Sequence, residues 1–161
     1  MKKEDLVGRS LSSISTKNEI NAFMGVDLGE GRELIPNCYS LKNRGSKKYV
    51  LLNWNMEGSV NGNEWYVLDK RVHFTNDPNF NSIMEKEREE LKVKGQTSTW
   101  GVDVENAKGV IEQLQNKSRR EIKGFRFFRI VQILKNSDGE YNLCLSGLEI
   151  YGIAFGKNWY F

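Results

Sequence analysis

Few residues in this 161-residue chain have the side chains that metal chemistry or nucleophilic catalysis requires. There is one histidine, His73, and there are two cysteines, Cys38 and Cys144, far apart in the sequence. A Cys/His metal site needs three or four ligands at short spacing, so this inventory argues against one. The G-x-S-x-G, P-loop, G-x-G-x-x-G and H-E-x-x-H motifs are also missing, which leaves no catalytic residue to predict. We therefore expect a protein that is not an enzyme.

The two cysteines and the first residues of the chain indicate in which cellular compartment the protein is expected. Each cysteine lies in an apolar, strand-like run, which favours two buried free thiols and a reducing environment over a disulfide. The basic start, Met1-Lys2-Lys3, has no apolar segment behind it, so it does not look like a signal peptide. No run approaches the ~18–20 apolar residues of a membrane span. We expect a soluble, intracellular, cytoplasmic protein.

The charged residues fall into distinct segments. The chain has 24 Lys+Arg against 21 Asp+Glu, a formal net charge of +3. This mild excess argues against a dedicated nucleic-acid binder, which usually has a clustered basic face. Residues 42–48 form a basic, glycine-containing loop, and residues 81–96 form a charged insertion. In the insertion we expect a solvated helix over 83–92, capped by Asn81-Ser82, more than a charged partner site.

The elements that must position these residues are mostly strands. Leu52, Trp54 and Met56 alternate with asparagines, which is the period of a half-buried strand. The turn at 61–63 leads into another strand at 64–68, and residues 125–133 form the strongest strand pattern. We expect residues 105–121 to be a loop or a short helix. Many short strands with little helix indicate an all-β sandwich or jelly roll.

Three segments carry motifs that resemble a known family. They are V-D-L-G at 26–29 with I-P at 35–36, N-W…G-S…W over 53–65, and R-I-x-Q…N-S-x-G…S-G-L-E-I-Y-G over 129–152. Together they resemble the galactose-binding-like, discoidin-type β-sandwich of the coagulation factor V/VIII C-type domains. The nearest variant is the intracellular one found in HECT-type E3 ubiquitin ligases and in BTB-domain proteins. The resemblance covers roughly residues 8–152, and the combined pattern is specific.

The resemblance implies one jelly-roll domain over residues 1–161, with the charged insertion at 81–96 and an aromatic C-terminal tail at 153–161. Met1 is compatible with a complete protein, although such a module can also be cut from a longer chain. Extracellular members bridge their termini with a disulfide, and the positions of the two cysteines here support the intracellular branch. Glu149 should face outward or pair with Arg129. The expected structural core is Trp54, Trp65, Phe128, Ile130, Leu145 and Leu148.

The resemblance also implies a site, because ligands of this superfamily usually meet loops at one end of the sandwich. Arg44 and Arg71 are the first candidates, since a planar guanidinium binds carboxylates through two hydrogen bonds. His73 suits a structural role as well as a binding one. The expected basic, amide-rich mouth, suited to an acidic peptide, a chain terminus or a sugar, comprises Lys42, Arg44, Lys47, Arg71, His73, Lys135 and Asn136.

The sequence is compatible with three functions. The first is a non-catalytic module that binds a protein or peptide, plausibly inside a ubiquitin-ligase or other multi-protein assembly. The second is a carbohydrate-binding module, in which Tyr49 and Trp100 would either stack on a sugar or pack in the sandwich. The third is a structural subunit of a large assembly, such as a ciliary one, bound by its surface and tail. We expect no cofactor, with calcium at Asp27, Glu30 and Glu33 as an open alternative.

Overall fold

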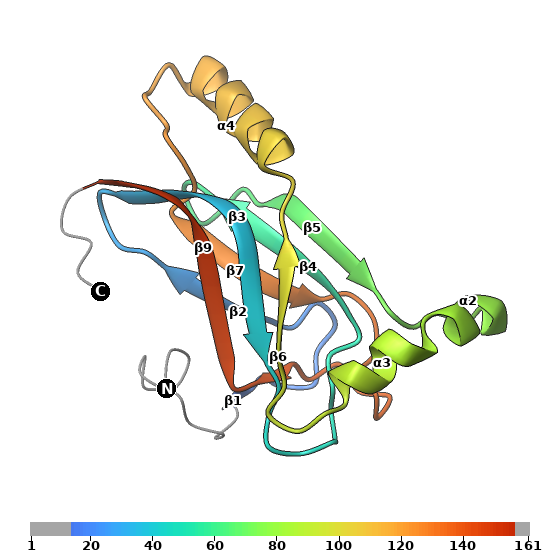
Figure 1. Cartoon of the computed structure of the whole chain (residues 1–161). Helices are drawn as coiled ribbons and strands as arrows, with labels where there is room; N and C mark the ends of the chain where they lie inside the picture. Colours follow the sequence, from blue (N-terminus) through green and yellow to red (C-terminus); the bar gives the residue numbers. More distant parts are fainter. Residues whose placement is uncertain (1–13, 157–161) are drawn as a thin grey trace.

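The computed structural model describes residues 14–156, which form two antiparallel sheets (Figure 1). The four-stranded sheet has the order β2-β7-β4-β5, and the three-stranded sheet has the order β6-β3-β9. A short pair, β1-β8, lies beside them. This arrangement confirms the predicted all-β sandwich. The strand bounds are β1 Ile14–Ser15, β2 Phe23–Asp27, β3 Arg32–Lys42, β4 Asn53–Ser59, β5 Tyr66–Val72, β6 Thr97–Gly101, β7 Phe127–Gln132, β8 Cys144–Leu145 and β9 Gly147–Gly156.

The core lies between the two sheets, because alternate residues of each strand point inward. In β4, Trp54 and Met56 are buried, and they face the same core as Phe128 and Ile130 of β7. Burying a large apolar side chain stabilises the fold by roughly 1.5–3 kcal/mol. Five of the six residues expected in the core are buried, namely Trp54, Phe128, Ile130, Leu145 and Leu148.

Trp65 is the exception to the expected core, since it is only partly buried. It precedes β5, and its ring lies under the guanidinium of Arg129, 4.0 Å from the ring centroid. Its indole Nε1 donates to the carbonyl of Gly62 over 3.1 Å, so the turn itself satisfies the N–H group. Arg129 forms its ion pair with Glu57 at 2.7 Å, while Glu149 faces outward. The expected alternative pairing of Glu149 with Arg129 is therefore wrong.

The charged insertion between β5 and β6 contains two helices, α2 (Pro78–Ile83) and α3 (Glu85–Leu91). The first begins earlier than the predicted helix, because Asp77 is the cap and accepts a hydrogen bond from the Asn79 N–H over 2.9 Å. Proline at the first helical position suits this start. The second helix matches the predicted segment, and Leu91 is its buried contact with the sandwich.

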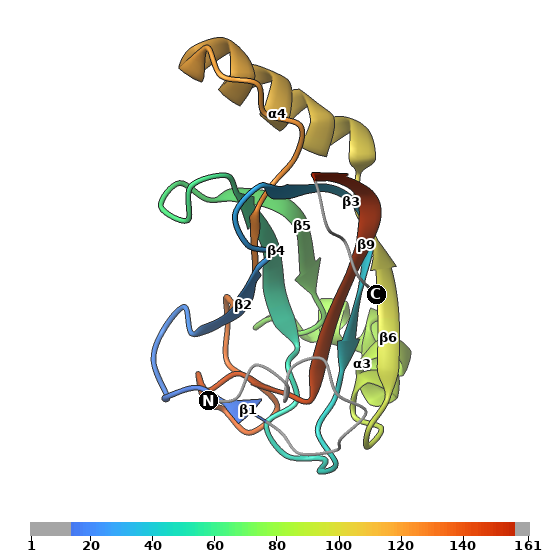
Figure 2. The same cartoon turned by 90° about the vertical axis from the view of Figure 1, so that its left-hand side faces the viewer.

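A third helix, α4 (Val104–Ser118), joins β6 to β7 and corrects the expected loop or short helix at 105–121. Asp103 caps it by accepting from the Asn106 N–H over 3.0 Å. Its buried residues are Ala107 and Ile111, four positions apart on one face. Val110 and Leu114 on the same face pack against the core as well, so one side of α4 lies on the sandwich near β3 and β5 while its other sides are polar (Figures 1 and 2).

The sandwich has two different ends. The helix end carries α4, and the loop end carries the β3–β4 loop (43–52), the β5–β6 connection (73–96) and the β7–β8 loop (133–143) (Figure 1). Hydrogen bonds join the three loops. Val50 N–H donates to the Ser137 hydroxyl over 3.0 Å, and the Asn43 side chain donates to the Leu91 carbonyl. Across the described residues, no helix has the length and apolar character to cross a membrane.

Candidate functional site

The predicted site residues all lie at the loop end, but they separate into three groups. Arg71 and His73 line a cleft at the side of the sandwich, which we call the side cleft. Lys135 and Asn136 line a second cleft between loops, which we call the loop cleft. Lys42 ends β3, and Arg44 and Lys47 follow in the β3–β4 loop, outside the linings of both clefts.

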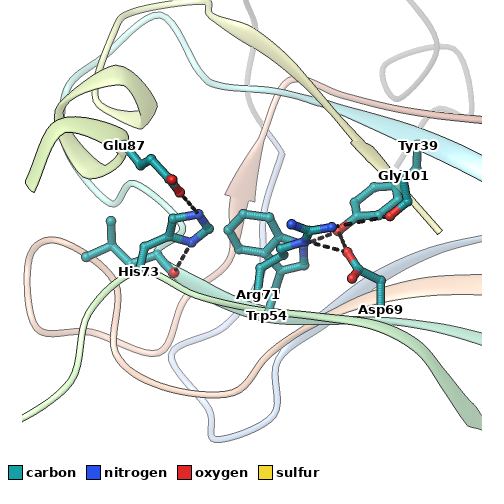
Figure 3. A network of polar contacts seen from close by, with 8 residues as sticks. Tyr39, Trp54, Asp69, Arg71, His73, Glu87 and Gly101 are labelled. Atoms are coloured by element: carbon teal, nitrogen blue, oxygen red, sulfur yellow. Dashed lines mark hydrogen bonds and ion pairs between the residues drawn. The ribbon is translucent and has the colours of Figure 1, made fainter. Parts of the chain in front are cut away.

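The side cleft has a volume of about 400 Å³ and opens where the edges of the two sheets meet. Strand β5 supplies one wall and β6 the other, while helix α3 contributes acidic residues (Figure 3). The sides of the cleft are therefore fixed by the sandwich itself. Its lining comprises Arg71, His73, Glu87, Glu90, Leu91, Ser98, Thr99 and Trp100.

Arg71 joins the two sheets across this edge. Its Nε donates to Asp69 over 2.7 Å, and its Nη2 donates to the Gly101 carbonyl of β6 over 3.2 Å (Figure 3). Burial lowers the pKa of Arg71, but the hydrogen bond and charge of Asp69 outweigh burial and leave that pKa raised. The guanidinium is a fixed positive charge in one wall of the cleft.

A buried hydrogen-bond chain supports Arg71 from below. The Trp54 Nε1–H donates to the Tyr39 hydroxyl over 2.8 Å, and that hydroxyl donates to Asp69 over 2.8 Å (Figure 3). Burial, followed by the hydrogen bond and charge of Asp69, raises the pKa of Tyr39 far above its usual value, so the phenol stays neutral. Trp100 packs edge-on against Trp54, with ring centroids 4.9 Å apart. The cleft therefore rests on the core.

His73 lies between Arg71 and α3 and is only 4% exposed. Its ring stacks on Trp54 with centroids 5.1 Å apart, and its Nδ1 lies 3.0 Å from the Leu52 carbonyl oxygen. Its Nε2 points to the Glu87 carboxylate at 3.6 Å (Figure 3). Burial lowers the pKa of His73, although the Leu52 bond and Glu87 act in the opposite direction. The histidine is thus held in place and exposes one ring nitrogen to the cleft.

The loop cleft differs in composition. It has a volume of about 700 Å³, and Phe74 and Leu134 in its wall are 42% and 43% exposed. Lys135 lies over the Tyr141 ring, 5.9 Å from its centroid. Asn136 is 5% exposed and organises the loop, because its Oδ1 accepts from two backbone N–H groups and its Nδ2 donates to Asn142. Its amide is therefore engaged within the loop.

The basic β3–β4 loop lies against acidic groups from its neighbours. The Tyr49 N–H donates to Asp138, and this bond, together with Ser137, Lys48 and Arg44, keeps the pKa of Asp138 below its usual value. Arg44 also lies over the Tyr49 ring, 5.6 Å from its centroid. The expected basic mouth is consequently a mixed-charge surface.

The calcium candidates lie near the opposite, helix end of the sandwich. Asp27 accepts two hydrogen bonds from Arg126, at 2.7 and 2.9 Å, and Glu33 accepts one from the Lys123 N–H over 2.9 Å. Glu30 is in the turn between β2 and β3. Within residues 14–156, no three His, Cys, Asp or Glu side chains are grouped so that they could hold a metal ion. Of the aromatic tail at 153–161, residues 157–161 lie outside the described residues.

Sequence reasoning did not place Glu87, Glu90, Ser98 or Thr99 in a site. The two glutamates are three positions apart and therefore share one face of α3. That spacing was the signal available in the sequence. Trp100 was considered as a stacking platform, and it lines the side cleft while packing on Trp54 and Tyr39.

Comparison with known proteins identifies the fold and two classes of sequence relative. No family model matches the chain. The CBM62 module of Clostridium thermocellum Xyl5A superposes with a TM-score of 0.57 at 15% identity, covering 95% of this chain and 84% of the module. A CBM32 module from Clostridium perfringens, in complex with GalNAc-β-1,3-galactose, gives 0.53 at 14% identity, over 88% and 76% of the two chains. The chain has the galactose-binding-like β-sandwich fold.

The sequence relatives narrow the variant. The chain is 34% identical to the E3 ubiquitin-protein ligase hecd-1 of Caenorhabditis elegans over 94% of its length, and 30% identical to Ufd4 of Drosophila melanogaster over 96%. It is 28% identical over 83% of its length to a BTB/POZ domain-containing protein of Arabidopsis thaliana. The chain spans 5%, 5% and 13% of these relatives. These are the two classes in which the resemblance placed the intracellular variant, so that prediction is confirmed.

Proposed function

We propose that this domain is a non-catalytic module that binds a protein or peptide ligand at its loop end. The observation that carries the proposal is the side cleft, where a fixed guanidinium, a histidine nitrogen and two carboxylates surround one small space on a rigid core. Groups of both charges suit the mixed polarity of a polypeptide. Similarity to ubiquitin ligases supports a role inside the cell, within a ubiquitin-ligase assembly.

The surroundings of His73 support binding over catalysis. Its described neighbours are the Leu52 carbonyl, the Glu87 carboxylate and the Trp54 ring. A histidine that acts as a general base needs a nucleophile or a substrate proton within hydrogen-bond reach. Within residues 14–156, neither ring nitrogen of His73 forms a hydrogen bond to a serine, threonine or cysteine side chain that it could activate. We further propose that residues 1–161 act as a single binding domain.

Selection from a random peptide library would test this function. The wild-type domain should enrich peptides that an Arg71→Ala variant binds at least about ten-fold more weakly, because Arg71 supplies the charged donor of the cleft. An Arg44→Glu variant tests the basic loop. Arg120→Glu, which lies beside α4 at the helix end, is the matched control.

Two results would overturn the proposal. One is a folded wild-type domain that enriches no peptide. The other is an equal loss of binding in the Arg120→Glu control, which would show that net charge and not the loop end holds the ligand. Circular dichroism of each variant shows that it is folded before binding is compared.

A carbohydrate ligand is the second candidate, and the loop cleft favours it. Phe74 and Tyr141 present ring surface there, and aromatic rings can stack on sugars. A glycan array with and without calcium tests this candidate, using Phe74→Ala to remove the ring. Phe23→Ala, at a ring 54% exposed on β2, is the control. An absence of binding at millimolar sugar would count against a carbohydrate ligand.

A further inference from the structure

The side cleft contains a histidine nitrogen and a carboxylate that face each other. The Nδ1 of His73 lies 3.0 Å from the Leu52 carbonyl oxygen, which can only accept. The ring proton is therefore on Nδ1, and in the neutral ring Nε2 is a bare acceptor. It faces the Glu87 carboxylate, also an acceptor, at 3.6 Å. His73 is only 4% exposed, whereas the Glu87 side chain is 62% exposed, so this nitrogen reaches the cleft beside a solvated carboxylate.

Such a pair of acceptors is satisfied by a group that donates several hydrogen bonds. A primary ammonium has three donors and a positive charge, and it can bind both acceptors at once. Glu90 lines the same cleft and adds a second carboxylate, whereas the charge of Arg71 is already matched by Asp69 at 2.7 Å. The lining residues therefore have an excess of negative charge at the α3 side, which attracts a cation.

The opposite wall of the side cleft favours a ligand that also carries a hydrogen-bond acceptor. Arg71 lines the cleft on the far side of His73 from Glu87 (Figure 3). A guanidinium donates to carbonyl or carboxylate oxygens. A ligand that satisfies the whole cleft must therefore carry an ammonium and, close by, an acceptor oxygen. At about 400 Å³ the cleft is near the small end of ligand pockets, ~300–1,000 Å³, which suits the end of a chain.

We propose that the side cleft binds the free amino terminus of a protein chain. The α-ammonium group donates to Nε2 of His73 and to Glu87, and the carbonyl oxygen of the first peptide bond accepts from Arg71. This inference rests on the proposed function, since it names the part of the peptide ligand that the site recognises. A lysine side chain also has an ammonium group, but its peptide carbonyl lies several bonds away.

Pairs of short peptides provide the direct test. The probes are X-Gly-Ser-Gly peptides with a carboxyl-terminal dye, X being each natural residue, with a free or an acetylated amino terminus. Fluorescence anisotropy should show binding of free peptides and a loss of at least about ten-fold on acetylation, because acetylation removes a charge-assisted donor. Glu87→Gln should weaken binding of free peptides by about ten-fold. Glu89→Gln, on the same helix but paired with Lys92, should change it by less than about two-fold.

A second measurement, nuclear magnetic resonance of the His73 ring nitrogens, tests the contact between the peptide ammonium and Nε2. Because the chain has a single histidine, its ring nitrogens give one set of ¹⁵N signals. Free peptides should shift the Nε2 signal, and acetylated peptides should leave it unchanged. Equal binding of free and acetylated peptides, or tight binding of acetylated peptides that carry an internal lysine, would overturn the amino-terminus proposal while peptide binding still stands. If neither form binds, the amino-terminus proposal fails, and the peptide-library selection decides separately whether the domain binds peptides.

Discussion

The side cleft and the loop cleft lie at the same end of the sandwich, but strands line the first and loops line the second. The side cleft takes Arg71 from β5 and Trp100 from β6, over the buried chain from Trp54 to Tyr39. The loop cleft takes Phe74 and Leu134 from loop segments, and both side chains are partly open to solvent. Charged groups are thus fixed where sheet edges meet, and apolar surface is offered where loops meet.

This difference has a physical reason. A charged group in a partly buried position must be paired and held, since leaving it unpaired there costs several kcal/mol. Strand edges provide that support through backbone carbonyls such as that of Gly101. Loops can carry exposed apolar rings with less support, because such rings need no partner. The comparison predicts that changes in the side cleft reach the core, while matched changes in the loop cleft stay local.

The largest expected effect comes from the floor of the side cleft. Trp54→Ala should lower the free energy of unfolding by about 3–5 kcal/mol, because it leaves a large cavity in the core. Phe74→Ala, in the loop cleft, should cost less than about 1 kcal/mol, since its ring is half exposed. Chemical denaturation of both variants measures the two values. Similar losses would show that the loop cleft is as much part of the core as the side cleft.

The loop cleft has its own internal support, and Asn136 provides it. Asn136→Ala should cost about 1–3 kcal/mol, because the backbone N–H groups of Asp138 and Glu140 lose their acceptor. Amide hydrogen exchange should rise at residues 137–142 and stay unchanged in β5 and β6. Asn76→Ala, at an exposed residue of the same cleft, is the control and should have little effect. Faster exchange in β5 would contradict the separation of the two clefts.

A smaller effect is expected at the hydroxyl that links core and side cleft. Tyr39→Phe should cost about 1–2 kcal/mol, because Trp54 Nε1–H loses its acceptor and Asp69 loses a donor. Tyr141→Phe in the loop cleft tests the same chemical change where the ring is only partly buried, and it should be close to neutral. Denaturation midpoints compare the pair. An equal loss in both variants would argue against a special role for the buried chain.

The sequence predicted the sandwich better than it predicted the site. Alternation such as Trp54 and Met56 in β4 reports burial directly, because one face of a strand meets the core. The helix α4 was expected only as a short alternative to a loop, because polar residues outnumber its apolar face of Ala107, Val110, Ile111 and Leu114. The side cleft could be predicted only in part. Arg71 and His73 are near in sequence, whereas Glu87 reaches them through the placement of α3, which depends on tertiary contacts at Leu91.

The smallest effect, and the one that isolates the side cleft, is a pH dependence at His73. Burial is the largest cause that lowers its pKa below 6.5, and Arg71 from β5 adds to it, whereas the Leu52 carbonyl and Glu87 from α3 oppose it. Below pH 6.5 the unfolded chain binds a proton that the folded ring resists. The free energy of unfolding should therefore fall as pH drops from 6.5 to the lowered pKa, and should be unaffected by this group above about pH 7.5.

Denaturation at pH 7.5 and pH 6 should show a smaller decrease in the free energy of unfolding for His73→Gln than for wild type. The loop cleft has no matching group, since the pKa of the nearby Asp138 is lowered away from this range. A histidine signal that titrates above pH 6.5 would contradict the prediction and would mean that Glu87 binds a protonated ring.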